Sequence, residues 1–246
     1  LVVPVILWAT GPSVDAVPHS GEEVRVVNYN VRGSVDTAGQ LAPDRIVAEI
    51  ASSDPHVVVI QEAARGWPIH GTMDLVSYLK RELDMEFAYV AAADGQFGNA
   101  ILSRLPMTET SQGLLPKDGS QDRSYVMVRI ETANGPLAVV GTHLQSRSTE
   151  QVLALLDAAG PTAPLVIAGD MNIAPTDPEA ALFTNAGFVD VVGATGDRCR
   201  TTSAEPTSEC DRPDWVFITP DLRAGGVQIG AGGASDHLAM HVTLVR

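Results

Sequence analysis

Several predicted strands of this 246-residue chain end in polar side chains whose chemistry suits phosphate groups and metal ions. The clearest case is the stretch 164–172, where an apolar run ends at Gly169 and is followed by Asp170 and Asn172. Because side chains alternate along a strand, Asp170 and Asn172 share one face. A carboxylate and an amide at the end of a buried strand need partners, a metal ion or a phosphate, although Gly, Asp and Asn are also ordinary turn residues.

Other predicted strands begin or end in the same kind of side chain. The full set is Asn30, Glu62, His143, Asp170, Asn172, Asp214, Asp236 and His237. The carboxylates of Glu62 and Asp236 are hard oxygen ligands suited to Mg²⁺, with Mn²⁺ or Ca²⁺ as alternatives, and Asn30 adds a neutral oxygen. The two histidines can exchange protons near neutral pH, and a carboxylate such as Asp214 can hold one of them in a single tautomer. The set predicts metal-assisted attack of water on phosphorus.

The sequence lacks the motifs of several other catalytic classes. It has no Gly-rich phosphate loop before a helix, no dinucleotide-binding fingerprint and no candidate nucleophile elbow. Lys and Arg number 16 against 30 Asp and Glu, a net charge of −14, which argues against a broad basic groove for nucleic acid. A nuclease is not excluded, because bound cations can neutralise a site locally.

The pattern of apolar residues predicts which elements carry these side chains. We predict helices at 41–52, 73–83, 149–159 and 178–185, and strands at 24–31, 57–62, 87–92, 98–103, 125–130, 137–144, 165–168, 188–192, 214–219, 227–229 and 238–245. Asn134-Gly135 predicts a hairpin turn, and Ser148 a helix cap. Strands alternate with helices early and pair as hairpins later, without a linker or repeat. This predicts two mixed sheets packed face to face with helices outside, in one domain spanning 21–246.

The first twenty residues have a different composition. Residues 1–9 are almost wholly apolar, and 10–20 form a spacer that contains Gly, Pro and Ser. We interpret 1–20 as the remnant of a secretory signal with a spacer, in which 14–16 is a passable cleavage site, and therefore expect an exported protein. An edge strand or a truncated membrane anchor are the alternatives, although the apolar run as given is too short to span a bilayer.

Two cysteines, Cys199 and Cys210, lie in a polar segment. In an exported protein they would close a small disulfide loop, and two free thiols are the alternative. Without a nearby histidine they do not form a structural zinc site.

Seven short motifs, taken in order, resemble the endonuclease/exonuclease/phosphatase superfamily, which is the deoxyribonuclease I-like group. They are Asn28-Tyr-Asn-Val-Arg32, Gln61-Glu62, Gly98-Asn-Ala-Ile-Leu-Ser-Arg104, Gly141-Thr-His-Leu144, Gly169-Asp-Met-Asn172, Asp214-Trp-Val-Phe217 and Ser235-Asp-His237. The resemblance implies a four-layer α/β sandwich, a divalent metal ion and hydrolysis of a phosphoester by activated water. Within that class we expect a secreted, endonuclease-like hydrolase.

The same resemblance implies roles for the metal-side residues. Glu62 would be the main metal ligand, with Asn30 beside it and Asp236 as a further carboxylate on the metal side. Asp170 would orient or deprotonate the attacking water.

The remaining residues would act on the substrate phosphate. By resemblance, Asn172 and His143 bind the scissile phosphate, and His237, paired with Asp214, contacts it or takes part in proton transfer. Arg123 stands where many members place a phosphate-binding side chain, and a solvated arginine at a strand end is the alternative.

Two departures from the family's branches leave the substrate open. Cys210-Asp-Arg212 is similar to part of an inositol-polyphosphate phosphatase motif, but the apolar strand begins after Asp214, so we place Asp211 in a loop. Sphingomyelinases usually carry an apolar membrane-docking hairpin; the sequence has no exposed aromatic cluster for one, although residues 66–69 could form a small apolar loop. A phospholipid or sugar-phosphate phosphoesterase is therefore the first alternative, and a non-catalytic binding relative the second. We expect a monomer with a phosphoester substrate, nucleic acid among the options, and no stable protein partner.

Overall fold

The computed structural model describes residues 23–92 and 95–246. The predicted leader and spacer, residues 1–20, and the cleavage site at 14–16 lie outside the described residues.

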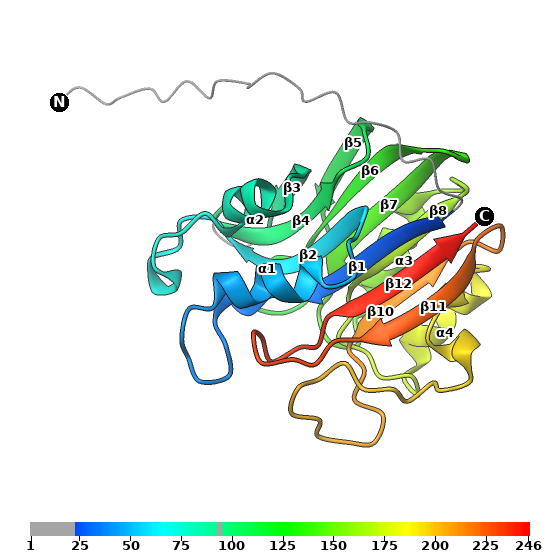
Figure 1. The fold of residues 1–246 in the computed structure, drawn as a ribbon. Coiled ribbons are helices and arrows are strands. Elements are labelled where there is room, and N and C mark those ends of the chain that lie inside the picture. Colours follow the sequence, from blue (N-terminus) through cyan, green and yellow to red (C-terminus); the bar gives the residue numbers. More distant parts are fainter. Residues whose placement is uncertain (1–22, 93–94) are drawn as a thin grey trace.

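Two six-stranded sheets form the centre of the molecule (Figure 1). The first has the order β11-β12-β1-β2-β4-β3, made of β1 (Glu23–Asn30), β2 (Val57–Ala64), β3 (Glu86–Ala91), β4 (Phe97–Ser103), β11 (Arg223–Ile229) and β12 (Met240–Val245). The second has the order β5-β6-β7-β8-β10-β9, made of β5 (Met107–Leu114), β6 (Ser124–Thr132), β7 (Gly135–His143), β8 (Leu165–Asp170), β9 (Val189–Asp190) and β10 (Asp214–Ile218). Both sheets are mixed, because β1 with β2 and β7 with β8 are parallel pairs among antiparallel ones.

Helices cover the outer face of each sheet. Helices α1 (Pro43–Ala51) and α2 (Leu75–Leu83) pack on the first sheet, and α3 (Thr149–Ala159) and α4 (Pro178–Asn185) pack on the second. The layers are therefore helix, sheet, sheet and helix, which confirms the predicted four-layer sandwich. None of the described helices is long and apolar enough to cross a membrane.

The space between the sheets is filled by alternate residues of the central strands. Val59, Ile101, Val139, Val166 and Val216 lie in this inner core and are fully buried. Their sequence neighbours point to the helices instead, so a strand covered on both faces becomes a continuous apolar run. Burial of these apolar surfaces is the main favourable term in folding.

Most predicted elements are confirmed, with boundaries shifted by a few residues. Asn134-Gly135 makes the turn between β6 and β7, and Ser148 caps α3 by accepting a hydrogen bond from the Gln151 amide. Strand β5, whose residues are mostly exposed and polar, was not predicted from the sequence. An edge strand with one sheet neighbour buries little surface, so it leaves a weak hydrophobic pattern.

A loop between β2 and α2 is fastened at both ends. The amide of Gly66 donates to the Met73 carbonyl, and Arg65 Nη2 lies 2.7 Å from Asp74 Oδ2. Asp74 also caps α2, because its side chain accepts from the Ser77 amide at 3.0 Å. Partial burial would raise the pKa of Asp74, but the hydrogen bonds from Arg65 and Ser77 outweigh it and hold the pKa below its ordinary value of 3.8.

We predict that Asp74→Ala lowers the free energy of unfolding by about 1 kcal/mol at pH 7, the usual cost of a lost helix cap. Since the folded-state pKa is depressed, this stabilisation is complete above pH 3.8 and disappears as the pH falls through the folded-state pKa. Urea unfolding of wild type and variant at pH 7 and pH 2.5 measures the loss of stability and its dependence on pH. A stability difference that is the same at the two pH values would contradict the assignment.

The segment before β10 is closed by a disulfide between Cys199 and Cys210, as predicted. Inside this loop, Thr202 and Ala204 bind the segment that leads into β12: Leu238 N donates to Thr202 O, and Ala204 N donates to Asp236 O. The loop therefore contacts the segment that carries two predicted site residues, Asp236 and His237.

We predict that the oxidised protein has no free thiol by mass spectrometry after alkylation without reductant. The loop is short, so its closure stabilises the fold by about 2–3 kcal/mol. Reduction is expected to speed amide hydrogen exchange in residues 200–210 while β8 stays protected. The double variant Cys199→Ala/Cys210→Ala is the control, because its exchange rates cannot change on reduction. Two alkylated cysteines in the unreduced protein would refute the pairing.

Candidate active site

The predicted site residues of the second sheet lie side by side because of strand register. His143 at the end of β7 pairs with Asp170 at the end of β8, and Asp170 pairs with Asp214 at the start of β10. Alternation from Ala168 and Val216, which lie in the inner core, turns Asp170 and Asp214 inward as well. Three polar side chains thus replace apolar ones where the inner core ends.

The first sheet brings Asn30 and Glu62 to the same place. The Asn30 amide nitrogen donates to Asp170 Oδ2 at 2.9 Å and to Glu62 Oε1 at 3.2 Å, so one side chain links β1, β2 and β8. The sheets approach closely here: a Cβ on Gly141 would come within 2.7 Å of Val59 Cγ1.

Glu62 has an unusual backbone conformation. The pairing of β2 with β4 shifts register between Ile60 and Ala63, and Glu62 has a φ of 55°. A bulge of this kind changes the direction of a side chain, and left-handed backbone is costly for a residue with a Cβ. The bulge lets Gln61 bond to Asn28 at 2.9 Å in the interior while Glu62 reaches Asn30.

The carboxylates at this end have a charge environment that fits a divalent cation. Burial raises the pKa of Glu62; the Asn30 hydrogen bond opposes this, and the charges of Asp170 and Asp236 add to it. Within residues 23–92 and 95–246, neither Glu62 nor Asp170 forms an ion pair with Lys or Arg. Buried hard oxygens in excess of cationic partners are the donor set of Mg²⁺ and related ions.

A second potential ligand group overlaps the first. Oxygen and nitrogen atoms of Asp170, Asp214 and His237 all lie within 4.8 Å of one another. Asp236 is placed differently: it is partly exposed, and its Oδ2 lies 3.4 Å from Arg32 Nε. Asn30 and Glu62 are thus hydrogen-bonded to each other, whereas Asp236 lies at the solvent-exposed edge of the site. The charge of Asp236 still raises the pKa of Glu62.

His237 and Asp214 form the predicted pair. His237 Nδ1 lies 2.8 Å from Oδ2 of Asp214, which is fully buried, and His237 Nε2 lies 3.7 Å from Asp170 Oδ2. Burial alone would lower the pKa of His237, but the charge and hydrogen bond of Asp214, helped by Asp170 and Asp236, raise it to about 10. His237 is therefore an imidazolium at neutral pH, with Nδ1–H donated to Asp214.

His143 is in the opposite protonation state. Burial lowers its pKa to about 4, even though the charge of Asp170 opposes this. Asn172 Nδ2 lies 3.0 Å from His143 Nε2 and also donates to the Leu144 carbonyl at 3.0 Å. The Asn172 amide N–H donates to Asp170 Oδ1 at 3.0 Å, so the turn after β8 is tied to the site.

Arg123 lies just before β6 and faces this site. It lines a pocket together with Glu62 and His143, and burial lowers its pKa while the charges of Asp170 and Glu62 oppose the shift. The Arg123 side chain is partly buried. The side chain of Asn99 holds the neighbouring backbone, with its amide donating to the Ser124 carbonyl at 2.9 Å.

Thr202, which lies in the disulfide loop, is a site residue that was not predicted from the sequence. Its hydroxyl donates to Asp214 Oδ2 at 2.7 Å, on the same oxygen that binds His237, and its backbone carbonyl accepts from Leu238. A threonine in a polar loop carries no strand or spacing signal. The Asp211 carboxylate, by contrast, accepts a hydrogen bond from the Thr207 amide of the same loop. Asp211 therefore lies in a loop, as predicted.

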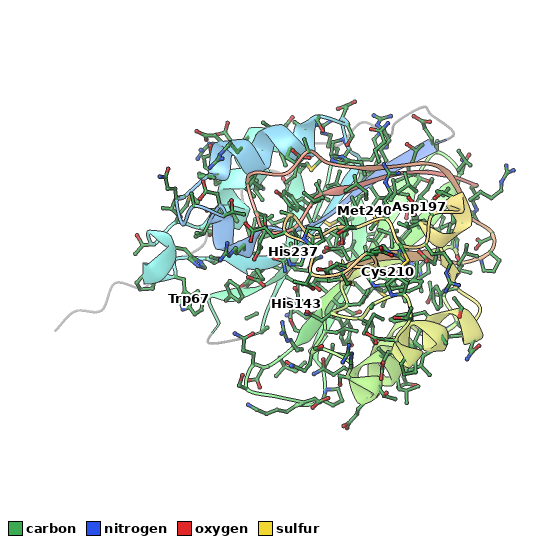
Figure 2. All side chains as sticks on the ribbon, turned by 90° about the horizontal axis from the view of Figure 1, so that it is seen from below. Trp67, His143, Asp197, Cys210, His237 and Met240 are labelled. Carbon is green, nitrogen blue, oxygen red and sulfur yellow. A yellow bond between two sulfur atoms is a disulfide. The ribbon has the colours of Figure 1, made fainter. Side chains whose placement is uncertain are left out.

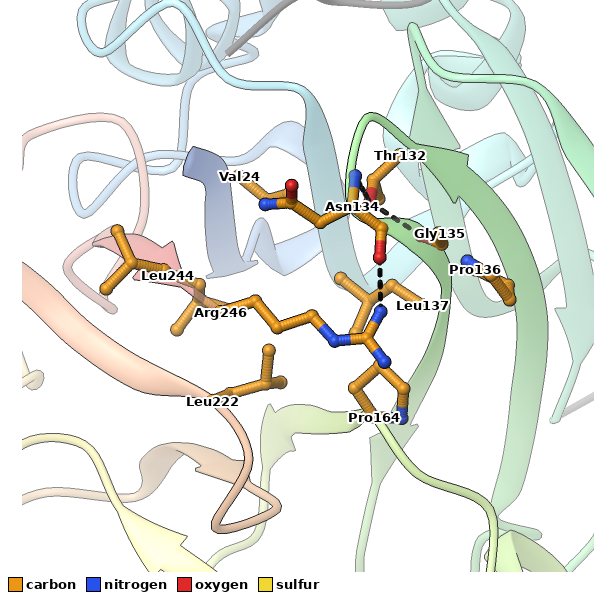
Figure 3. Close-up of a pocket in the computed structure, with 11 residues that line it drawn as sticks. Val24, Thr132, Asn134, Gly135, Pro136, Leu137, Pro164, Leu222, Leu244 and Arg246 are labelled. Atoms are coloured by element: carbon orange, nitrogen blue, oxygen red, sulfur yellow. Dashed lines mark hydrogen bonds between the residues drawn. The ribbon is translucent and has the colours of Figure 1, made fainter. Parts of the chain in front are cut away.

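Figure 2 shows His143 and His237 near the middle of one face, with Trp67 to the left and Cys210 to the right. The hollow at the opposite end of the strands is different in kind. Its lining includes Val24, Leu137, Leu244 and Arg246, which donates to the Asn134 carbonyl (Figure 3). No Asp, Glu or His side chain is among the described residues that line it.

Comparison with known proteins places this geometry in context. No curated protein sequence matches the chain. The solved endonuclease/exonuclease/phosphatase from Beutenbergia cavernae DSM 12333 has a TM-score of 0.76 and 24% identity, over 91% of this chain and 71% of its own. D. rerio TDP2 complexed with single strand DNA product has a TM-score of 0.71 and 22% identity, over 91% and 99%. The human Nocturnin catalytic domain with bound sulfate anion has a TM-score of 0.72 and 17% identity, over 90% and 93%.

At these identities the solved structures show a shared fold. The model of the endonuclease/exonuclease/phosphatase family matches residues 27–237, which include the ends of all five strands that form the site. The chain therefore belongs to the endonuclease/exonuclease/phosphatase family.

Proposed function

We propose that this protein is a divalent-metal-dependent phosphodiesterase that hydrolyses a phosphoester with activated water, as a secreted, endonuclease-like hydrolase. The observation that carries the proposal is the convergence of polar side chains from separate strand ends on Asp170. Its carboxylate accepts from Asn30 and from the Asn172 backbone and lies 3.4 Å from His143 and 3.7 Å from His237. Binding alone does not require an intact set of this kind, which argues against a non-catalytic relative.

Glu62 and Asn30 would hold the metal ion, which we propose to be Mg²⁺ with Mn²⁺ or Ca²⁺ as alternatives, and Asp236 would add negative charge beside it. The bound ion would polarise a phosphoryl oxygen and offset charge in the transition state.

The other residues would act on water and phosphate. Asp170, held by two hydrogen bonds, orients the water and accepts its proton as the water oxygen bonds to phosphorus. Neutral His143 and the Asn172 side-chain amide, which bond to each other in the structure, would turn their N–H groups to phosphate oxygens, and Arg123 would add positive charge. The imidazolium of His237 stabilises the developing charge and supplies a proton from Nε2 as the bond to the leaving oxygen breaks.

Nucleic acid is the substrate class we propose first. Related structures contain a single strand DNA product and a sulfate anion, whose shape resembles that of phosphate. A phospholipid or sugar-phosphate ester is the second candidate, favoured by Leu41, Trp67 and Phe97, which line a groove that reaches Glu62. Export is consistent with the disulfide, because such bonds persist in oxidising compartments. We propose that the protein acts as a monomer.

We predict that excess EDTA abolishes hydrolysis of bis(p-nitrophenyl) phosphate and that added Mg²⁺ or Mn²⁺ restores it. Glu62→Gln is expected to weaken metal binding and to lower kcat about 100-fold, while the metal-free variant unfolds at the same or higher urea concentration, because a buried charge is removed. Isothermal titration with Mn²⁺ measures the affinity, and Glu179→Gln, at a buried glutamate on α4, is the matched control. Full activity in EDTA would exclude the mechanism.

A second prediction concerns the His237–Asp214 pair. We expect His237→Ala to lower kcat by roughly 10²–10⁴-fold, the range of a lost general acid. Asp214→Asn keeps the shape but cannot stabilise the imidazolium, so it should lose a comparable amount. The double variant should be no worse than the poorer single variant, since both act on one function. Circular dichroism confirms that each variant is folded, and multiplicative losses would show that the two residues act separately.

A further inference from the structure

The groove beside Glu62 is built from aromatic side chains of separate segments. Trp67 and Phe97 have ring centroids 4.9 Å apart, and His70 meets Trp67 edge-on at 5.3 Å. The groove has a volume of about 430 Å³, and Leu41, which is 48% exposed, lies at its rim. This volume is within the usual range of about 300–1,000 Å³ for small-ligand pockets.

We propose that this groove binds the nucleobase of a nucleotide substrate, next to the phosphate at Glu62. The inference rests on the proposed function and narrows it, because it specifies which part of the substrate lies outside the catalytic residues. Aromatic faces bind bases by stacking, which tolerates sequence because every base has a π-face.

The position of the groove fits this occupant. Glu62, Phe97 and Gln121 line both the groove and the pocket that contains Arg123 and His143, so the two spaces adjoin. A base in the groove would therefore lie beside a phosphate in the site. The aromatic rings are also held in place: the His70 ring packs on Gly33, where a Cβ would come within 2.1 Å of it.

The charge around the groove argues against a long polyanion. Among the described residues that line the two spaces, the basic ones are Arg32 and Arg123, apart from the histidines, and Arg32 is paired with Asp236. Burial lowers the pKa of His70, so its ring is neutral at neutral pH. With a net charge of −14 on the chain, a duplex would gain few phosphate contacts, and its bases are stacked out of reach.

Polar groups at the rim argue against an acyl chain. Gln121 and Arg32 face the same space as the aromatic rings, and both can bond to the edge of a base. A lipid tail would offer the Gln121 amide no hydrogen-bond partner. A free nucleotide and a single strand present the same stacking face. The experiment therefore compares these two sources of the base directly.

The test is isothermal titration of the full chain in Mg²⁺ with deoxyadenosine 5′-monophosphate and with deoxyribose 5-phosphate, which lacks the base. We expect the base to increase affinity at least about fivefold, the lower end of one stacking contact. Trp67→Ala should remove this preference without changing the affinity for deoxyribose 5-phosphate, and Trp67→Phe should keep most of it. Leu153→Ala, at an exposed side chain on α3, is the control and should change neither.

Equal affinities in wild type, or equal weakening of both ligands by Trp67→Ala, would overturn the inference. If Trp67→Ala does not fold, Trp67→Leu, which fills space without a ring, gives the same comparison. A tetradeoxyadenylate that binds more tightly than the monophosphate identifies a single strand as the source of the base, and weaker binding identifies a nucleotide. Dihexanoyl phosphatidylcholine is the lipid probe. If it binds more tightly than both the monophosphate and the tetradeoxyadenylate, and this binding depends on Trp67, the nucleobase proposal is overturned in favour of a lipid.

Hydrolysis of bis(p-nitrophenyl) phosphate is measured in parallel. Its absence, with the base preference intact, would reject the proposed hydrolase and leave the base site. Hydrolysis without any base preference would reject the base site and leave the hydrolase.

Discussion

The cost of burying Asp170 is the constraint on which the site depends. Its side chain is 3% exposed and lies where an apolar inner core ends, so its charge must be matched by hydrogen bonds or by positive groups. The matching groups come from Asn30, Asn172 and His237, which lie in β1, after β8 and before β12. These segments must all reach one point, which requires both sheets to face each other in the observed register. The fold and the chemistry therefore share one electrostatic requirement.

The two histidines show how position alone assigns different tasks to identical side chains. His237 faces the buried carboxylate of Asp214, whose effect exceeds the cost of burial and raises the pKa to about 10. His143 is buried beside an amide and near Arg123, and its pKa falls to about 4. One ring is a cation and proton donor, and the other is a neutral hydrogen-bonding group. The disulfide loop contributes to this division, because Thr202 fixes the Asp214 oxygen that binds His237.

The sequence predicts those features that depend on local pattern. Apolar runs that begin or end in polar residues locate β1, β2, β7, β8 and β10, and alternation along each strand places Asp170 and Asp214 inward. Some features that depend on contacts between distant segments leave no pattern in the sequence. Thr202 lies in a loop without periodicity, and the bulge that directs Glu62 appears only when β2 pairs with β4. The groove is likewise assembled from Leu41, Trp67, His70 and Phe97, whose proximity no single stretch reveals.

Anomalous diffraction from a crystal grown with Mn²⁺ tests the central claim most directly. The account predicts a peak within about 2.0–2.3 Å of a Glu62 carboxylate oxygen, with Asn30 oxygen or water completing the shell. The peak should vanish in Glu62→Gln crystals while the contacts of Asp170 with Asn30 and Asn172 remain. A well-ordered site without a peak at millimolar Mn²⁺, or a peak bound elsewhere with Glu62 uninvolved, would contradict it.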